Sequence, residues 1–274
     1  MKKWALRFLI SALILYIPVI DQAMTNRMPG ARSLALSGAT VALAGEESLF
    51  HNQAGIAFLE RHSLFIACES AFMLKEFSLM AAGGVLPTAW GTFGVSFYRM
   101  GSSLYSENKA GIAYAKKLGS RLAASIQFDY LTEKLPENRQ AFRTVTFEAG
   151  VLCHLSPKVA TGFHIFNPVG AHPEISGSTI PLPWSIRAGS VWNLNPALLL
   201  CAEVAKNEDG PVHFKTGIEY SPVREIVIRA GAGGDPLAFT LGAGFLFRDF
   251  RFDVAFSHHH ALGLSPAAGI TWMP

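Results

Sequence analysis

Apolar and polar residues alternate along many short stretches of this chain, and no other feature limits its possible folds so strongly. In Phe250–Ser257 the large apolar side chains fall on one face, while Arg251, Asp253 and Ser257 fall on the other. The same alternation recurs in residues 121–130, 144–151 and 212–221. Successive residues of a β-strand point to opposite faces. The sequence therefore predicts a sheet with one apolar and one polar face.

Clusters of Gly, Pro, Asn and Asp divide the chain from residue 62 onward into candidate strands, each about the length that crosses a bilayer at a tilt. Their number is 14, which is even, as in closed bacterial outer-membrane barrels. The candidate strands are 62–71, 75–86, 90–100, 106–117, 121–133, 142–155, 157–166, 184–194, 197–206, 212–221, 225–234, 237–248, 250–259 and 262–273. We therefore expect an all-β fold, a transmembrane antiparallel β-barrel of about 14 strands.

The positions of the aromatic residues favour a membrane barrel over a soluble secreted β-protein, whose apolar faces would have to be buried within the protein. Trp and Tyr prefer the bilayer interface, where the ring is half buried and its polar atom stays hydrated. Several of them lie near the ends of candidate strands and predict two aromatic girdles; they are Trp90, Trp184, Trp192, Trp272, Tyr98, Tyr105, Tyr130 and Tyr220.

The N-terminus carries the pattern of a secretory signal peptide in residues 1–23. Lys2, Lys3 and Arg7 precede an apolar run, Phe8–Ile20, that is shorter than a spanning helix; a retained N-terminal anchor is the alternative. Removal of this segment takes away three positive charges and one negative charge, which lowers the net charge from +3 to +1. So small a charge does not indicate a nucleic-acid partner. A signal peptide, together with 25 glycines and only 16% charged residues, is typical of an exported membrane barrel. The sequence therefore predicts an outer-membrane location in a Gram-negative bacterium, with membrane lipid as a partner.

Residues 24–61 differ from the strand series and predict a small plug segment inside a barrel formed by residues 62–274. Gly30–Ala44 is rich in small residues, and Glu46–Ala57 contains a turn marked by Asn52 and Gly55. On the polar faces of the strands, both signs of charge occur, and charges inside a narrow barrel are expected to pair. These inward candidates are Arg121, Gln127, Asp129, Glu148, Arg187, Glu203, Lys215, Glu219, Arg229, Arg251 and Asp253.

No motif predicts catalysis or a cofactor. The run His258–His260 cannot converge on one metal ion from a single strand, so a polar strand end is expected there. No Ser lies in a Gly-x-Ser-x-Gly elbow, which disfavours a lipid hydrolase. The odd number of cysteines (Cys68, Cys153 and Cys201) and their wide separation predict neither a disulfide framework nor a metal site. The chain is thus predicted not to be an enzyme.

The N-terminal motifs resemble two families of outer-membrane barrels, the FadL-type channels and the PorV/PorQ barrels of type IX secretion systems. The matching stretches are Gly30–Arg32, Ser37–Ala44 and Phe50–Ala57, with Gln53 in place of the usual proline and Ser37 in place of one glycine. The resemblance implies a 14-stranded barrel with its lumen occupied by the N-terminal segment. It also implies either diffusion of hydrophobic molecules or a role in protein export and surface attachment.

We therefore expect passive transport of small hydrophobic compounds by a plug-gated or lateral route. Phe50, Asn52, Gly55 and Phe58 are the candidate plug residues along this path, and Gly83, Gly84 and Pro87 are the candidates for a kink that opens the wall. A PorV/PorQ-like role with secretion-system partners is the alternative, and a structural barrel without transport is the third possibility.

Overall fold

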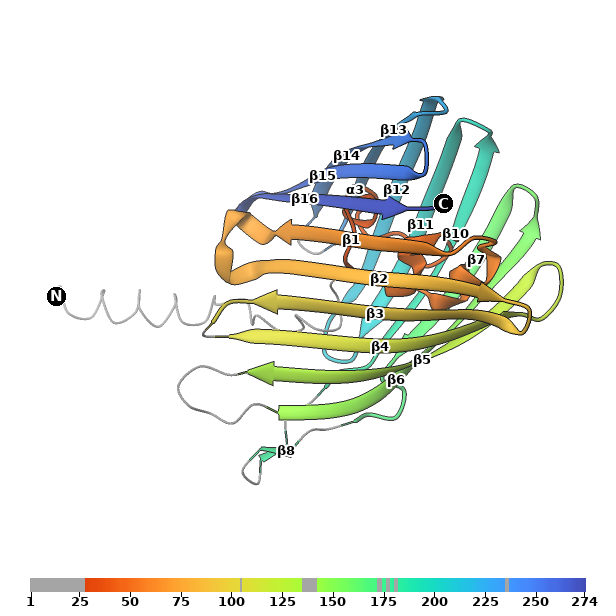
Figure 1. The fold of residues 1–274 in the computed structure, drawn as a ribbon. Helices are drawn as coiled ribbons and strands as arrows, with labels where there is room; N and C mark the ends of the chain where they lie inside the picture. Colours follow the sequence, from red (N-terminus) through yellow and green to blue (C-terminus); the bar gives the residue numbers. More distant parts are fainter. Residues whose placement is uncertain are drawn as a thin grey trace.

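The computed structural model describes residues 28–103, 105–134, 142–171, 174–175, 178–179, 182–234 and 237–274. Fourteen antiparallel strands form a closed barrel in this part of the chain, with β1 pairing to both β2 and β16 (Figure 1). The strands of the barrel are β1 (Ser63–Ser70), β2 (Ser78–Thr88), β3 (Gly91–Gly101), β4 (Ser106–Lys117), β5 (Leu122–Lys134), β6 (Phe142–Ser156), β7 (Val159–Phe166), β10 (Ser185–Asn195), β11 (Leu198–Asn207), β12 (Val212–Val223), β13 (Ile226–Gly233), β14 (Ala238–Phe247), β15 (Phe250–His259) and β16 (Gly263–Trp272). A separate hairpin pairs β8 (Glu174–Ile175) with β9 (Ser178–Thr179).

The predicted all-β barrel of 14 strands is confirmed, and most strands lie within two or three residues of their predicted bounds. The largest difference is at β2, which begins at Ser78 instead of residue 75. Residues 71–77 form two short 3-10 turns instead, η3 (Ala71–Met73) and η4 (Lys75–Phe77). Phe72 and Met73 adopt positive φ there, in the connection between β1 and β2.

The outer face of the barrel is apolar, as the alternation predicted. Large aliphatic and aromatic side chains that point outward are strongly exposed, for example Ile66 (63%), Ile112 (67%) and Phe214 (70%). Such a continuous apolar exterior on a closed barrel is the surface that lipid covers. In the described residues, no helix is both long and apolar enough to span a membrane.

The aromatic girdle prediction is only partly correct. Trp90 and Tyr220 are exposed (78% and 47%), but Tyr98 is buried (4%) and points into the barrel beside Leu79 and Met100. Tyr105 packs against the same inner cluster and donates a hydrogen bond to Glu107. The pleat explains the error at Tyr98, because Phe97 points outward and its neighbour must point inward.

The two rims of the barrel differ. One rim, here called the turn rim, carries short connections such as β2–β3 and β14–β15, together with the C-terminal end of β16. The other rim, here called the loop rim, carries the longer connections, including those after β5 and β7. Outer-membrane barrels generally place short turns at the periplasmic side and long loops outside.

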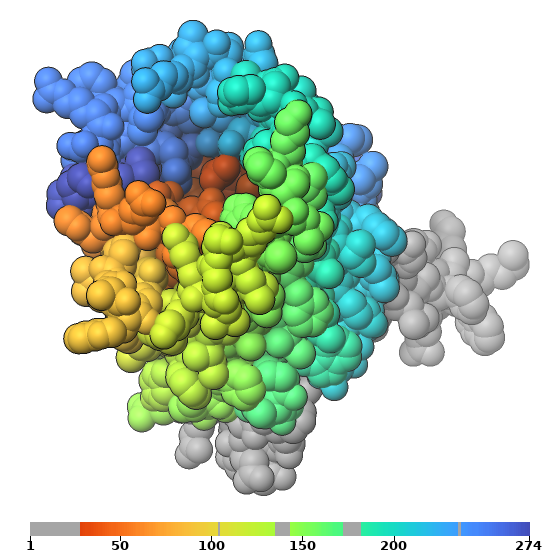
Figure 2. Space-filling model, turned by 90° about the vertical axis from the view of Figure 1, so that its right-hand side faces the viewer, coloured from red at the N-terminus to blue at the C-terminus, as the bar shows by residue number. Residues whose placement is uncertain are grey.

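Residues 28–58, here called the N-terminal segment, lie within the ring of strands. The segment contains one short helix, α3 (Ala31–Ala35), and two 3-10 helices, η1 (Glu46–Phe50) and η2 (Gln53–Phe58). Helix α3 contacts β13–β16, whereas η2 contacts β3–β6. Because these strands lie on different sides of the ring, the segment occupies the space between them. Seen from the turn rim, its dark red atoms lie in the middle of the ring of strands (Figure 2).

Glycines on the inner wall let the segment approach closely. A Cβ atom at Gly231 would lie 2.7 Å from the backbone of Leu36 and Ser37, and one at Gly242 would lie 2.6 Å from Ala35 Cβ. Elsewhere on the wall, in β2, a Cβ atom at Gly83 would lie 2.8 Å from Leu49. Contacts this short exclude any side chain unless the segment shifts. The wall and the segment therefore have complementary shapes.

Several predictions fall outside the described residues or need correction. The signal peptide, residues 1–23, and the first residues of the 24–61 segment lie outside the described part, so these domain boundaries stay predictions. Arg121, predicted to point inward, is exposed because it lies in the β4–β5 turn, outside the ladder.

Candidate functional site

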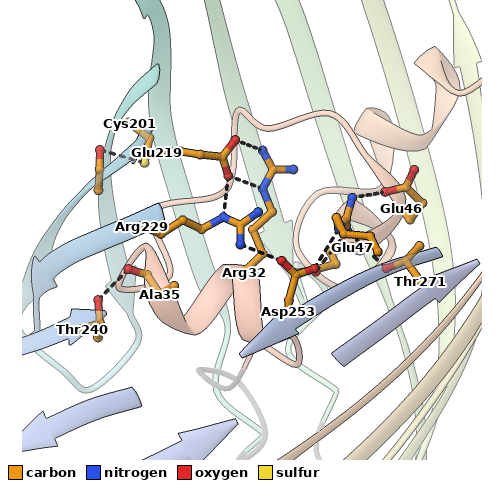
Figure 3. Close-up of polar contacts among 12 residues, drawn as sticks. Arg32, Ala35, Glu46, Glu47, Cys201, Glu219, Arg229, Thr240, Asp253 and Thr271 are labelled. Carbon is orange, nitrogen blue, oxygen red and sulfur yellow. Dashed lines mark hydrogen bonds and ion pairs between the residues drawn. The ribbon is translucent and has the colours of Figure 1, made fainter. Parts of the chain in front are cut away.

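The interior between the N-terminal segment and the wall is the candidate site, and a chain of alternating charges crosses it (Figure 3). Arg32 of α3 binds Glu219 of β12 through two hydrogen bonds of 2.9 and 3.0 Å. Glu219 also accepts a hydrogen bond of 2.6 Å from Arg229 of β13, which in turn binds Asp253 of β15 at 2.6 Å. Each charge thus has an oppositely charged partner, as buried charges require.

The same series of ion pairs leads back to the N-terminal segment through Arg251 of β15. Its guanidinium contacts Asp253 at 2.8 Å, Glu46 at 3.1 Å and Glu47 at 3.4 Å. Arg32, Glu46 and Glu47 therefore attach two parts of the segment to one side of the barrel.

A second anchor holds the middle of the segment. Arg187 of β10 and Glu203 of β11 form a buried ion pair, with contacts of 2.7 and 2.8 Å. The Glu203 carboxylate accepts hydrogen bonds from the backbone N–H groups of Thr40 and Val41, both at 2.9 Å. Arg187 donates to the carbonyl oxygen of His51 at 3.0 Å. The pair thus satisfies backbone groups of the segment, which belongs to no strand ladder.

The third anchor is centred on Glu148 of β6. Its carboxylate accepts a hydrogen bond of 2.7 Å from Gln53 of η2, lies 2.9 Å from His164 Nε2 and pairs with Lys109. Lys109 also lies 3.5 Å from Asp129. This anchor holds a single segment residue, Gln53, whereas each of the other two holds at least three.

Burial changes the ionisation of two groups on the segment. Burial raises the pKa of Glu47 to about 7, although the positive charge of Arg251 opposes the rise. Burial also holds the pKa of His51 well below its usual value, and the nearby charges of Arg187 and His164 lower it further. His51 is therefore neutral at physiological pH, and neither of its ring nitrogens has a hydrogen-bond partner in the described residues.

Cavities occur at both ends of the segment. One of about 370 Å³ lies at the loop rim, between α3 and the ends of β12–β15. Here it is called the mouth cavity, and its lining combines apolar groups with hydroxyl, basic and acidic groups; it includes Met28, Leu34, Ser37, Glu69, Lys215, Ala238 and Thr240. A second cavity of about 520 Å³ lies at the turn rim, between Leu59 and Trp90. A small polar cavity of about 30 Å³, large enough for a water molecule, lies beside Lys109 and Phe50.

Of the four predicted plug residues, only Phe50 lines one of these cavities, the small polar one. Asn52 is fully buried, and its side-chain amide donates to the carbonyl oxygens of Val41 (2.7 Å) and Val151 (3.1 Å). Gly55 is buried against Ser48, and Phe58 packs edge-on against His154 at 4.5 Å. Asn52 and Gly55 thus lie in tight packing, and a role for the four residues in ligand passage stays a prediction.

The strand pairing is regular at the predicted wall kink, and the kink itself stays a prediction. Gly83 and Gly84 of β2 pair residue by residue with both β1 and β3, and Pro87 pairs with Thr92 of β3, without a register shift. The absence of a side chain at the two glycines leaves space for neighbouring residues. Gly83 makes room for Leu49 and Phe50 inside, and Gly84 lies on the outer face.

Sequence reasoning identified the wall charges but missed their partners on the segment. Arg32, Glu46 and Glu47 are charged residues in a segment predicted to be enclosed. Because buried charges need partners of opposite sign, their presence there could have indicated ion pairs with the wall. His164 and Lys109 were missed as well; Lys109 shares its strand face with the inward residues of β4. His258 and His259 end β15 at the loop rim, and His259 lines the mouth cavity.

Comparisons with known proteins agree with this architecture. No protein-family model and no curated protein matches the sequence. The fold is similar to the toluene transporter TodX of Pseudomonas putida, with a TM-score of 0.68, 12% identity, and coverage of 92% of this chain and 99% of that one. It is also similar to the toluene transporter TbuX of Ralstonia pickettii (TM-score 0.67, 12% identity, 89% and 97% covered).

A FadL homologue of Pseudomonas aeruginosa gives a TM-score of 0.63 at 10% identity, with 91% and 98% covered. The chain has the fold of these FadL-type channels. None of these three structures is a secretion-system protein, so the resemblance to PorV/PorQ barrels gains no support from them.

Proposed function

We propose that this protein is an outer-membrane channel for passive diffusion of small hydrophobic compounds. The mouth cavity carries the proposal, because it lies between the N-terminal segment and the wall in a barrel with the fold of hydrocarbon transporters. Its volume of about 370 Å³ falls within the range of small-molecule sites. Its apolar residues suit a hydrophobic ligand, and its position at the loop rim suits uptake from outside.

The segment is the gate in this proposal. The mouth cavity and the turn-rim cavity lie at opposite ends of the barrel. The N-terminal segment lies between them, packed against the glycines of the wall. The strand pairing from β1 to β3 has no register shift, which favours the plug-gated route over the lateral one in this proposal. Passage of a ligand from the mouth cavity to the turn-rim cavity then requires part of the N-terminal segment to move away from the wall.

The test is uptake of labelled toluene by cells that produce the protein but lack other hydrocarbon channels. Ala238→Phe narrows the mouth cavity and is expected to reduce uptake, whereas Ala261→Phe, at an exposed position of the same rim, leaves it unchanged. Equal uptake by cells with and without the protein would overturn the proposal. That result would favour the barrel without transport, which the close fit between segment and wall also suits.

A further inference from the structure

A groove runs along the outer face of β2, where the wall meets lipid. In the strand register, Gly84 lies directly between Leu64 of β1 and Val95 of β3. Two residues earlier in β2, on the same face, Ala82 lies between Ile66 and Phe97 in the same way. The four flanking side chains are 48 to 63% exposed and form two ridges, with the small residues of β2 as the floor.

The groove deepens around Gly84 into a cavity of about 610 Å³. Leu86, Phe93 and Trp272 complete its walls toward the turn rim, and His62 closes that end. Except for His62, Ser63 and the Trp272 indole, the lining residues have no polar side-chain atoms. A Cβ atom at Gly84 would lie 3.1 Å from Leu64 Cδ2, so any larger residue would fill the space.

The turn-rim end of the groove carries two basic residues, Arg61 and His62. Asp249 is also near, because its carbonyl oxygen accepts a hydrogen bond of 2.7 Å from the Met273 N–H. His62 packs edge-on against Trp272, with ring centroids 5.9 Å apart. Arg61, the preceding residue, is exposed. Glu60 is the nearest acid in the sequence, but it lines the separate turn-rim cavity together with Lys116 and Lys117. An apolar channel that ends at a cation beside an interfacial Trp has the polarity of a membrane phospholipid.

We propose that this groove binds one phospholipid molecule. An acyl chain lies over Gly84 between the ridges, and the phosphate lies beside Arg61 and His62. The groove opens at the turn rim, so the lipid comes from the leaflet on that side of the membrane. The site is independent of the lumen and of the proposed transport.

The experiment compares lipid retention by the purified full-length protein in native mass spectrometry, with phosphatidylglycerol added to the detergent. Gly84→Leu fills the groove and is expected to reduce the lipid-bound fraction about fivefold. Arg61→Ala removes the cation and is expected to weaken phosphatidylglycerol binding by a similar factor, about fivefold. The matched control is Ala243→Leu, which lies on the outer face between Ile228 and Val254, far from the groove, and retains the lipid.

Gly84→Ala is the second variant if Gly84→Leu does not fold, as judged by the mobility of the unboiled protein on a gel. Equal lipid retention by wild type, Gly84→Ala and Ala243→Leu would overturn the proposal. Loss of lipid in Ala243→Leu equal to that in the Gly84 variants would also overturn it, because binding would then not be local to the groove.

Discussion

The contact between Arg32 and Glu219 allows a quantitative test of how the N-terminal segment is held. Arg32 belongs to the segment, while Glu219 belongs to the wall and also binds Arg229 at 2.6 Å. The Arg32 and Glu219 side chains are only 16% and 14% exposed, so solvent screens their interaction weakly. Removing one partner therefore costs far more than in a surface ion pair.

The two single substitutions are expected to differ. Arg32→Met removes two charge-assisted hydrogen bonds but leaves Glu219 paired with Arg229, so we expect a loss of about 1–3 kcal/mol in the free energy of unfolding. Glu219→Met leaves two buried guanidinium groups beside each other, so we expect a loss of about 3–5 kcal/mol. The double variant is expected to lose about 1–2 kcal/mol less than the sum, because the contact is counted twice in that sum.

The assay is equilibrium unfolding in urea with lipid vesicles, followed by tryptophan fluorescence and by the mobility of the unboiled protein. Arg121→Met is the matched control; this arginine is exposed, so its loss is expected to change stability by no more than about 0.5 kcal/mol. Equal effects of Arg32→Met and Glu219→Met that add in the double variant would refute the reasoning. They would mean that the segment is not anchored through this contact.

Three further predictions concern the segment. Gly231→Val is expected to displace Leu36 from the wall and to raise passage of hydrophobic compounds, measured as dye uptake, while unboiled gel mobility shows that the barrel still closes. Asn52→Ala leaves the carbonyl oxygens of Val41 and Val151 without this donor and is expected to cost about 1–3 kcal/mol in urea unfolding; no loss would contradict a structural role. The pKa of Glu47, about 7 in the folded protein, lies above its ordinary value of 4.5, so its contribution to stability is full below pH 4.5 and is lost as pH rises through 7. Wild type is therefore expected to lose more stability than Glu47→Gln across this pH range, and parallel pH profiles of the two proteins would contradict the raised pKa.

The strand count and most strand bounds could be predicted because alternation is a local property. Whether Phe252 and Val254 share a face depends only on their spacing, and so does the inward direction of Asp253. The same rule, applied to the neighbour of Phe97, would have placed Tyr98 inside the barrel. Turn positions followed from Gly, Pro and Asn for equally local reasons.

The sequence by itself thus determined a closed barrel with an apolar exterior and a charged interior. Only the tertiary structure decided which charges pair, because Arg32 and Glu219 are 187 residues apart and meet only when the ring closes around the segment. It also decided that Gly83 fits Leu49 and that Gly84 opens a groove toward lipid, where the sequence had suggested a kink. Glycine has no side chain to indicate a direction, so its role depends on what approaches it in space.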